Sequence, residues 1–205
     1  MPDKIEKHPL TPFLPENAKI LMLGSFPPKK DKWSLEFFYP NWFNDMWRII
    51  GTVFFNDKEY FIVPGQKKFD KEGIEAFCKE KGIALFDTAS EVIRLKDNAS
   101  DKFLEIVTPT DLRQILSRIP ECKAIVTTGQ KATDVIVETF GCAEPPVGEM
   151  SELNPHLTAD TSDNDIKNKD TLHFWRMPSS SRAYPLKLEN KAVFYKKMFE
   201  TEGLI

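Results

Sequence analysis

Four segments of this 205-residue chain contain residue types that can bind a polar ligand. Each segment is short, carries glycine, hydroxyl or carboxylate groups, and lies at the end of an apolar run. They are Gly24-Ser25-Phe26, Asp87-Thr88, Thr127-Thr128-Gly129 and Pro178-Ser179-Ser180-Ser181. Main-chain amides, hydroxyls and carboxylates together can hold a ligand and stabilise charge that develops on it. These segments predict one polar site if the fold gathers them.

The apolar runs that lead into these segments are typical of buried strands. They cover residues 19–23, 83–86, 124–128 and 171–177, and turn-forming or polar residues end each of them. Helices are predicted over residues 41–54, 71–81, 108–118, 130–140 and 189–200. Asn41 is available to cap the first helix, and Gly82 ends the second.

Strands that alternate with helices predict an α/β fold, because parallel neighbouring strands need long crossover connections. We expect a three-layer α/β/α sandwich around a mainly parallel four-stranded sheet, formed by residues 1–205 as a single domain. Residues 55–70 and 143–170 are rich in turn-forming residues, and we expect them to be surface insertions. In such sheets ligands bind beyond the carboxyl ends of the strands, where the four polar segments are predicted to lie.

The overall charge gives no electrostatic footprint for a nucleic acid or an anionic membrane. Lys and Arg number 28 and Asp and Glu number 31, so the net charge is −3. A polyanion would need a local basic face. Seven lysines are candidates for it, with ordinary solvated lysines as the alternative: Lys29, Lys30, Lys32, Lys187, Lys191, Lys196 and Lys197.

The N-terminal segment is charged and proline-broken, and no apolar stretch approaches the ~20 residues that span a bilayer. We therefore expect a cytoplasmic protein with no membrane partner. The cysteines and histidines lack metal-ligand spacing, so we expect core thiols and no metal. These residues are Cys78, Cys122, Cys142, His8, His156 and His173. We also expect a monomer without a cofactor.

Two longer segments form a more specific pattern. LMLGSFPP, followed by FFYPNWFNDMWRII, comes at the first predicted strand, and MPSSSRAY comes after the last. In this order they resemble the uracil-DNA glycosylase superfamily, and most closely its hypoxanthine-DNA glycosylase branch. ALFDTAS, TPTDLRQIL and AIVTTGQKA occur between them in the order and spacing of that family, so the resemblance covers nearly the whole chain.

The resemblance implies hydrolysis of the N-glycosidic bond of a deaminated base, uracil or hypoxanthine, during base-excision repair. DNA containing such a base is then the partner, and the nucleotide is extruded into the site. A catalytically inactive DNA- or nucleotide-binding module of the same fold is the alternative. The family's Gly-His-Pro is replaced by Pro40-Asn41-Trp42-Phe43, so Asn41 competes with Asn44 for the catalytic position, for which we favour Asn44.

The resemblance also implies roles for individual residues. Asn44 would hold the attacking water through its amide carbonyl, with a helix-capping residue as the alternative. The expected base pocket contains Gly24, Ser25, Phe26, Phe38, Tyr39 and Asp87. There the loop amides would bind a base carbonyl, the aromatic rings would stack on the base or belong to the core, and Asp87 would accept a base N–H or act as a cap. The expected DNA phosphate and intercalation loop is Pro178, Ser179, Ser180, Ser181 and Arg182.

Overall fold

The central sheet contains the four predicted parallel strands and one more strand at its edge. The computed structural model describes residues 5–95, 103–155 and 171–205. The parallel strands are β2 (Ile20–Gly24), β3 (Ile83–Asp87), β6 (Ala124–Thr127) and β8 (Leu172–Arg176), in the spatial order β3-β2-β6-β8. The fifth strand, β7 (Glu149–Leu153), pairs antiparallel with β8.

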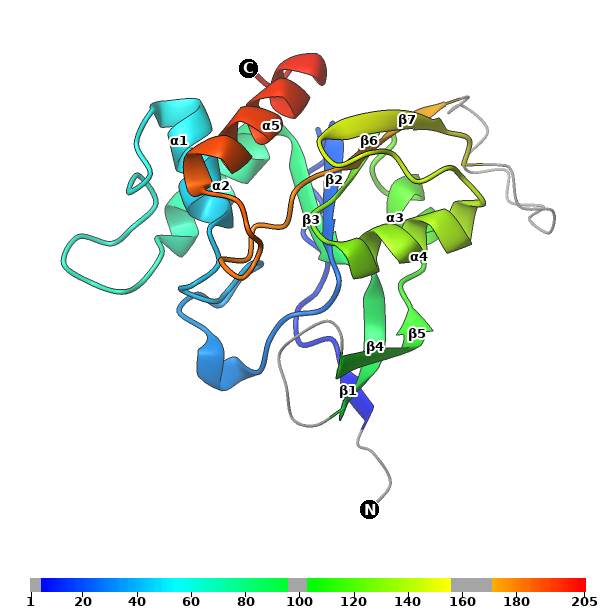
Figure 1. Cartoon of the computed structure of the whole chain (residues 1–205), viewed down its shortest axis with the longest axis horizontal. Helices are drawn as coiled ribbons and strands as arrows, with labels where there is room; N and C mark the ends of the chain where they lie inside the picture. Colours follow the sequence, from blue (N-terminus) through cyan, green and yellow to red (C-terminus); the bar gives the residue numbers. More distant parts are fainter. Residues whose placement is uncertain (1–4, 96–102, 156–170) are drawn as a thin grey trace.

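Helices cover both faces of this sheet and give the three layers expected from the sequence (Figure 1). On one face lie α1 (Met46–Phe55), α2 (Lys71–Lys81) and α5 (Leu188–Thr201). On the other face lie α3 (Leu112–Ser117) and α4 (Gln130–Phe140). The predicted α/β/α arrangement is therefore confirmed.

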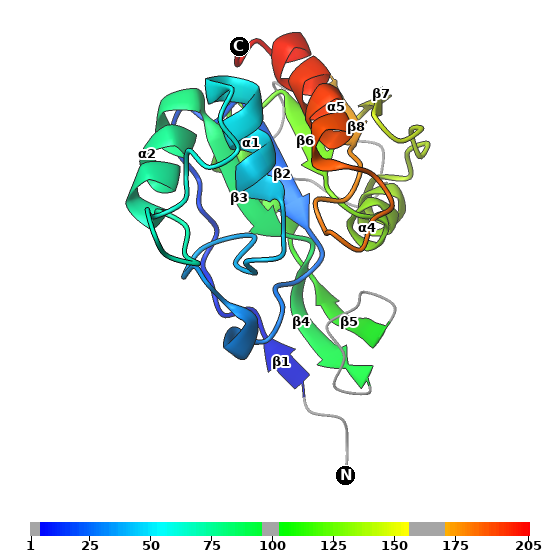
Figure 2. The same ribbon diagram turned by 60° about the vertical axis from the view of Figure 1, so that its left-hand side comes forward.

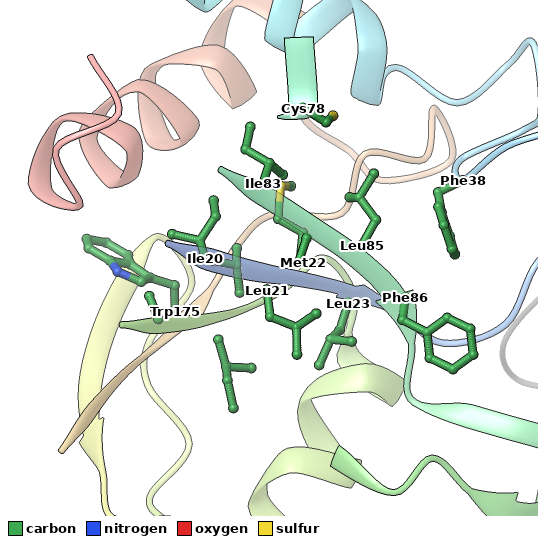
Figure 3. Packing of buried hydrophobic residues seen from close by; sticks show 14 of the residues in the cluster. Ile20, Leu21, Met22, Leu23, Phe38, Cys78, Ile83, Leu85, Phe86 and Trp175 are labelled. Carbon is green, nitrogen blue, oxygen red and sulfur yellow. The ribbon is translucent and has the colours of Figure 1, made fainter. Parts of the chain in front are cut away.

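The two helical layers bury both faces of β2, so its sequence is a continuous apolar run rather than an alternating one. Residues 20–23 of this strand are fully buried. Ile20 and Met22 point to the side of Cys78 on α2, and Leu21 and Leu23 point to the opposite side (Figure 3). Successive side chains of a strand alternate between its faces, so this short segment contributes to both halves of the core.

Local capping signals set the ends of α2 where the sequence predicts them. The Asp70 carboxylate accepts a hydrogen bond from the Gly73 amide at 3.1 Å. At the other end Gly82 adopts the left-handed conformation with φ 71°, and a Cβ there would lie 2.4 Å from the Asn17 carbonyl oxygen. Glycine is required at this position for both reasons.

Two other predicted helices begin later than expected. The helix predicted from residue 108 begins at Leu112, because β5 (Leu104–Pro109) occupies the preceding residues and Asp111 caps the helix through the Gln114 amide. The helix predicted from Asn41 begins at Met46 with Asp45 as its N-cap, because residues 42–43 form a turn and Asn41 and Asn44 form bridges with Trp33 and Ser181.

A second, three-stranded antiparallel sheet was not predicted. It consists of β1 (Ile5–Lys7), β4 (Ala89–Arg94) and β5, in the order β1-β4-β5. Figure 2 shows it beyond the carboxyl end of β3, from which the chain passes almost directly into β4. The N-terminal segment is thereby attached to the side of the sheet where the polar segments lie.

Both segments predicted as surface insertions are partly structural, so that prediction is wrong in part. Phe61 and Phe69 of the first segment are buried in the core. In the second segment β7 belongs to the central sheet, whereas residues 156–170, with His156, lie outside the described residues. Within the described part of the chain, no helix has the length and apolar character needed to cross a membrane.

Candidate functional site

A cavity of about 750 Å³ lies at the carboxyl ends of the parallel strands. Gly24 and Asp87 pair across β2 and β3, and Thr128 and Ser179 follow β6 and β8, so the strand ends predicted to converge do so around one space. The predicted catalytic, base-pocket and phosphate-loop residues all line this cavity except Pro178, which is buried and whose carbonyl accepts a hydrogen bond from Tyr195. Thr88 and Thr127, which belong to the four predicted polar segments, are fully buried and do not line it. The lining comprises residues 24–28, 38–41, 43, 44, 87, 128–131 and 179–185.

The loop at residues 24–28 is held in place through its carbonyl groups. The Gly24 carbonyl accepts a hydrogen bond from the Thr88 amide at 2.9 Å, and the Pro27 carbonyl accepts one from the Arg94 guanidinium at 3.1 Å. The Pro28 carbonyl accepts one from the Trp33 indole at 2.7 Å. These bonds fix the cavity wall on the side of β2.

Asp87 lies directly over Gly24, and a Cβ on Gly24 would be only 2.4 Å from Asp87 Oδ1. The other carboxylate oxygen, Oδ2, is 2.9 Å from Nε2 of His8. A carboxylate only accepts hydrogen bonds, so the Nε2–H group of His8 donates this one. His8 therefore fixes the orientation of the Asp87 carboxylate.

His8 occupies a nearly closed aromatic environment next to the cavity. Its ring centroid lies 5.2 Å from that of Phe26 and 4.6 Å from that of Phe86. Nδ1 lies 3.1 Å from the Leu10 amide nitrogen and 2.9 Å from the Leu10 carbonyl oxygen. No spacing signal marks His8 in the sequence, because 79 positions separate it from Asp87.

Asn41 and Asn44 perform the same local task in the turn before α1. The Asn41 side-chain carbonyl accepts a hydrogen bond from the Phe43 amide at 2.8 Å, and that of Asn44 accepts one from the Met46 amide at 2.9 Å. Each carbonyl oxygen has a second lone pair, so either is able to accept another hydrogen. Both residues line the cavity, and these hydrogen bonds do not favour one over the other.

The start of α1 is joined to the loop that follows β8. Asn44 and Ser181 form an antiparallel bridge, and the Asp45 amide donates to the Ser180 carbonyl at 2.9 Å. Within the loop, the hydroxyls of Ser179 and Ser181 accept from the amides of Ser181 and Ala183. These bonds make residues 179–183 an ordered wall of the cavity.

Asp45 is a buried carboxylate surrounded by three cations. Arg182 Nε lies 2.8 Å from its Oδ1, and Arg48 and Lys191 each place a nitrogen 3.9 Å from the carboxylate. Burial lowers the pKa of Lys191, and Asp45 partly offsets this effect. Burial likewise lowers the pKa of Arg48, with repulsion from Arg182 as a further cause. Three cations facing one carboxylate leave this side of the cavity favourable to an anion.

Two helices begin beside the cavity. Asn44 and Asp45 precede α1, and Gln130 and Lys131, which line the cavity, are the first residues of α4. The N-terminus of a helix carries partial positive charge and amides without intrahelical partners. Together with Arg182 and Lys131, these helix ends counter the negative charge of Asp87.

The aromatic lining residues have different exposures. Phe38 is only 3% exposed and packs on Phe37 and Phe86, so most of its ring belongs to the core. Tyr39 has φ 51° and its hydroxyl lies 3.1 Å from Thr128 Oγ1. Burial raises the pKa of Tyr39 well above its usual value, so the phenol stays neutral. Phe26 is half-buried, with Arg94 beside its ring.

The predicted basic face is reduced by burial and ion pairing. Lys191 is 0% exposed and donates to the Ser181 carbonyl at 2.7 Å, so its place in an exposed lysine surface was predicted wrongly. Lys30, Lys196 and Lys197 lie within 4 Å of Glu36, Glu200 and Glu149. The positive groups at the cavity are instead Arg182 and Lys131, which the seven-lysine prediction did not contain.

Comparisons with known proteins bear on the fold. No family model matches the chain, and no curated protein matches it. Among solved structures, it is similar to the solution NMR structure of a putative uracil DNA glycosylase from Methanosarcina acetivorans, with a TM-score of 0.60 and 19% sequence identity. The likeness covers 98% of this chain and 99% of that one. The chain therefore has a uracil-DNA glycosylase-like α/β fold.

Proposed function

We propose that the protein is a DNA glycosylase that hydrolyses the N-glycosidic bond of a deaminated base, uracil or hypoxanthine, in DNA. The observation that carries the proposal is that Asp87, Asn44 and the loop at residues 179–182 line the same cavity. A glycosylase needs a group that recognises the base, a positioned water and a contact for the phosphate backbone. Each of these three segments suits one of the three tasks.

Asp87 suits recognition of a deaminated base. Its Oδ1 lies over Gly24, whereas Oδ2 is bound by His8, so Oδ1 is the oxygen we assign to the ligand. Deamination converts a ring nitrogen that accepts a hydrogen bond into an N–H that donates one. The Asp87 carboxylate, which only accepts hydrogen bonds, pairs with this N–H. Opposite the lone pair of an unmodified cytosine or adenine ring nitrogen, the carboxylate oxygen would be unpaired and repelled.

Asn44 suits the positioning of water. Its carbonyl already accepts from the Met46 amide, and its second lone pair can accept from a water aimed at the anomeric carbon. An amide is not a base, so its contribution is orientation rather than proton removal. The amino ends of α1 and α4 would stabilise the base as it leaves with negative charge.

The loop at residues 179–182 suits a phosphate of the extruded nucleotide. Among the described residues, Arg182 is bound to Asp45 through Nε, and its terminal nitrogens are the ones we assign to a phosphate. The hydroxyls of Ser179 and Ser181 accept from amides of the loop and retain their own hydrogens as donors. Contacts of this kind fix the position of the DNA without selecting a sequence.

The test is single-turnover base release from duplexes that contain one uracil or one hypoxanthine. We expect Asn44→Ala to lower the rate by about 10²-fold or more with little change in DNA affinity, because a water-positioning group acts in the transition state. Asn41→Ala is the matched control, since that side chain makes the same local hydrogen bond. A large loss only in Asn41→Ala would move the role to Asn41.

A second candidate is a DNA-binding module that does not release bases. The engagement of the Asn44 carbonyl by the Met46 amide favours it, because this bond alone accounts for an asparagine at that position. Lesion-dependent binding by the wild type without release of either base would establish the module and exclude the glycosylase.

A further inference from the structure

Phe43 holds a large apolar ring in solvent at the mouth of the cavity. It is 64% exposed and contributes to the cavity lining. A single exposed apolar side chain is ordinary on a protein surface, so exposure by itself indicates nothing. Phe43 differs from an ordinary exposed apolar residue in two respects, the anchored backbone that carries its ring and the cation beside the ring.

The backbone of Phe43 is fixed on both sides. Its amide donates to the Asn41 side chain at 2.8 Å, and the Asn44 amide donates to the Asn41 carbonyl, also at 2.8 Å. The next residue, Asn44, is bridged to Ser181. The ring thus projects from a tight, anchored turn, and an aromatic side chain with two rotatable bonds loses little freedom on contact.

A cation lies beside the ring. The Arg182 guanidinium carbon is 5.6 Å from the ring centroid of Phe43, and the same guanidinium is bound to Asp45 at 2.8 Å. Its side chain is 44% exposed, so it retains access to solvent. An apolar ring next to an accessible cation matches a base step of duplex DNA, where apolar base faces lie beside a phosphate.

We propose that Phe43 enters the base stack of duplex DNA and occupies the space left by the extruded nucleotide, while Arg182 holds a neighbouring phosphate. This inference rests on the proposed function. Apolar side chains inserted between base steps unstack and kink a duplex, and here the insertion would keep the nucleotide from returning. The loop at residues 179–182 offers only hydroxyl and guanidinium side chains, and the preceding Pro178 is buried.

The position of Phe43 favours the stack of the duplex over the interior of the cavity. Phe38 and Tyr39 are less exposed lining residues, and Phe38 is almost enclosed by the core. An extruded base would meet those rings inside the cavity and leave the exposed ring of Phe43 facing the duplex. The Phe43 ring is therefore needed only on duplex DNA, where base stacking has to be opened.

The experiment compares Phe43→Ala, Phe43→Leu and the wild type on duplex and single-stranded DNA. Tyr60→Ala is the control, because Tyr60 is also an exposed aromatic residue, at 52%, and does not line this cavity. The first measurement is base release under single turnover. The second is the fluorescence of 2-aminopurine next to the lesion, which rises when the stack opens and requires no bond cleavage.

We expect Phe43→Ala to slow release from duplex DNA by about tenfold or more and to remove most of the fluorescence rise. Release from single strands should stay within about twofold of the wild type, and Phe43→Leu should restore most of the duplex rate. Tyr60→Ala should match the wild type in every measurement. An equal loss on duplex and single strands would overturn the inference, because the ring would then act on the base or on the fold.

The fluorescence separates this inference from the proposed function. A wild-type protein that opens the stack through Phe43 but releases neither base would refute the glycosylase and retain the role of Phe43. Base release from duplex DNA with an unchanged fluorescence rise in Phe43→Ala would retain the glycosylase and refute the role of Phe43. Neither release nor a fluorescence rise in the wild type would refute both.

Discussion

Gly24→Ala tests the contact between the end of β2 and the carboxylate of Asp87. The new Cβ would lie 2.4 Å from Asp87 Oδ1, whereas ordinary contacts begin at 3.4 Å, so the oxygen has to move by about 1 Å. Gly24 does not adopt a positive φ, so the substitution adds no backbone strain of its own. The displaced carboxylate would lose its 2.9 Å hydrogen bond from His8.

The expected loss of stability follows from that hydrogen bond. A bond to a charged group contributes about 1.5–3 kcal/mol. Replacing glycine by alanine inside a strand returns about 0.5–1 kcal/mol of backbone entropy. The net decrease in the free energy of unfolding is then about 1–2 kcal/mol, which lowers the melting temperature of a chain of this size by about 2–8 °C.

A double-mutant cycle measured by urea unfolding checks the reasoning. In an Asp87→Ala background the clashing oxygen is absent, so Gly24→Ala should be neutral or slightly stabilising. The two backgrounds should therefore differ by about 1.5–3 kcal/mol in the effect of the substitution. The same destabilisation in both backgrounds would refute the proposed contact and place the cost elsewhere in β2.

Two further predictions concern DNA binding and alkaline stability. DNA binding should be weaker in the double variant Ser179→Ala, Arg182→Ala than in the wild type, and unchanged binding would remove the loop from the interface. In a salt titration the wild-type affinity should fall with a shallow log–log slope, equivalent to roughly 3–5 phosphates at about 0.9 per contact. Tyr195→Phe should flatten the loss of stability above pH 10, because burial raises the pKa of Tyr195 well above its ordinary 10.0, so only the unfolded chain ionises as the pH rises through that value. Unfolding by urea at a series of pH values measures this, and an identical pH profile in both proteins would contradict it.

Local signals in the sequence were sufficient to predict elements whose position depends on neighbouring residues of the chain. The cap at Asp70 and the left-handed Gly82 set both ends of α2 within the chain itself. The apolar runs identified all four parallel strands, because those strands are buried on both faces. The position of the cavity followed from topology, since parallel strands place their carboxyl ends on one side.

Features that depend on partners far away in the sequence could not be predicted from such local signals. β7 has the sequence EMSEL, and an exposed edge strand needs no apolar run, so nothing in its composition marked it. Lys191 has the composition of a surface residue and becomes buried only because Asp45 and the Ser181 carbonyl compensate its charge. His8 acquires its role only when β1 pairs with β4.

The cluster around Asp45 also has a consequence for the order in which the chain completes the cavity. Arg182 lies 137 positions after Asp45, and Lys191 lies farther still, on the C-terminal helix α5. Contacts of such long sequence separation form late, because a long loop has to close before they contribute. During synthesis the carboxylate emerges together with Arg48 but long before Arg182 and Lys191, and it has to remain partly hydrated until α5 docks. A chain without α5 lacks Lys191, which donates to the Ser181 carbonyl, so the wall formed by residues 179–183 is complete only after α5 has docked.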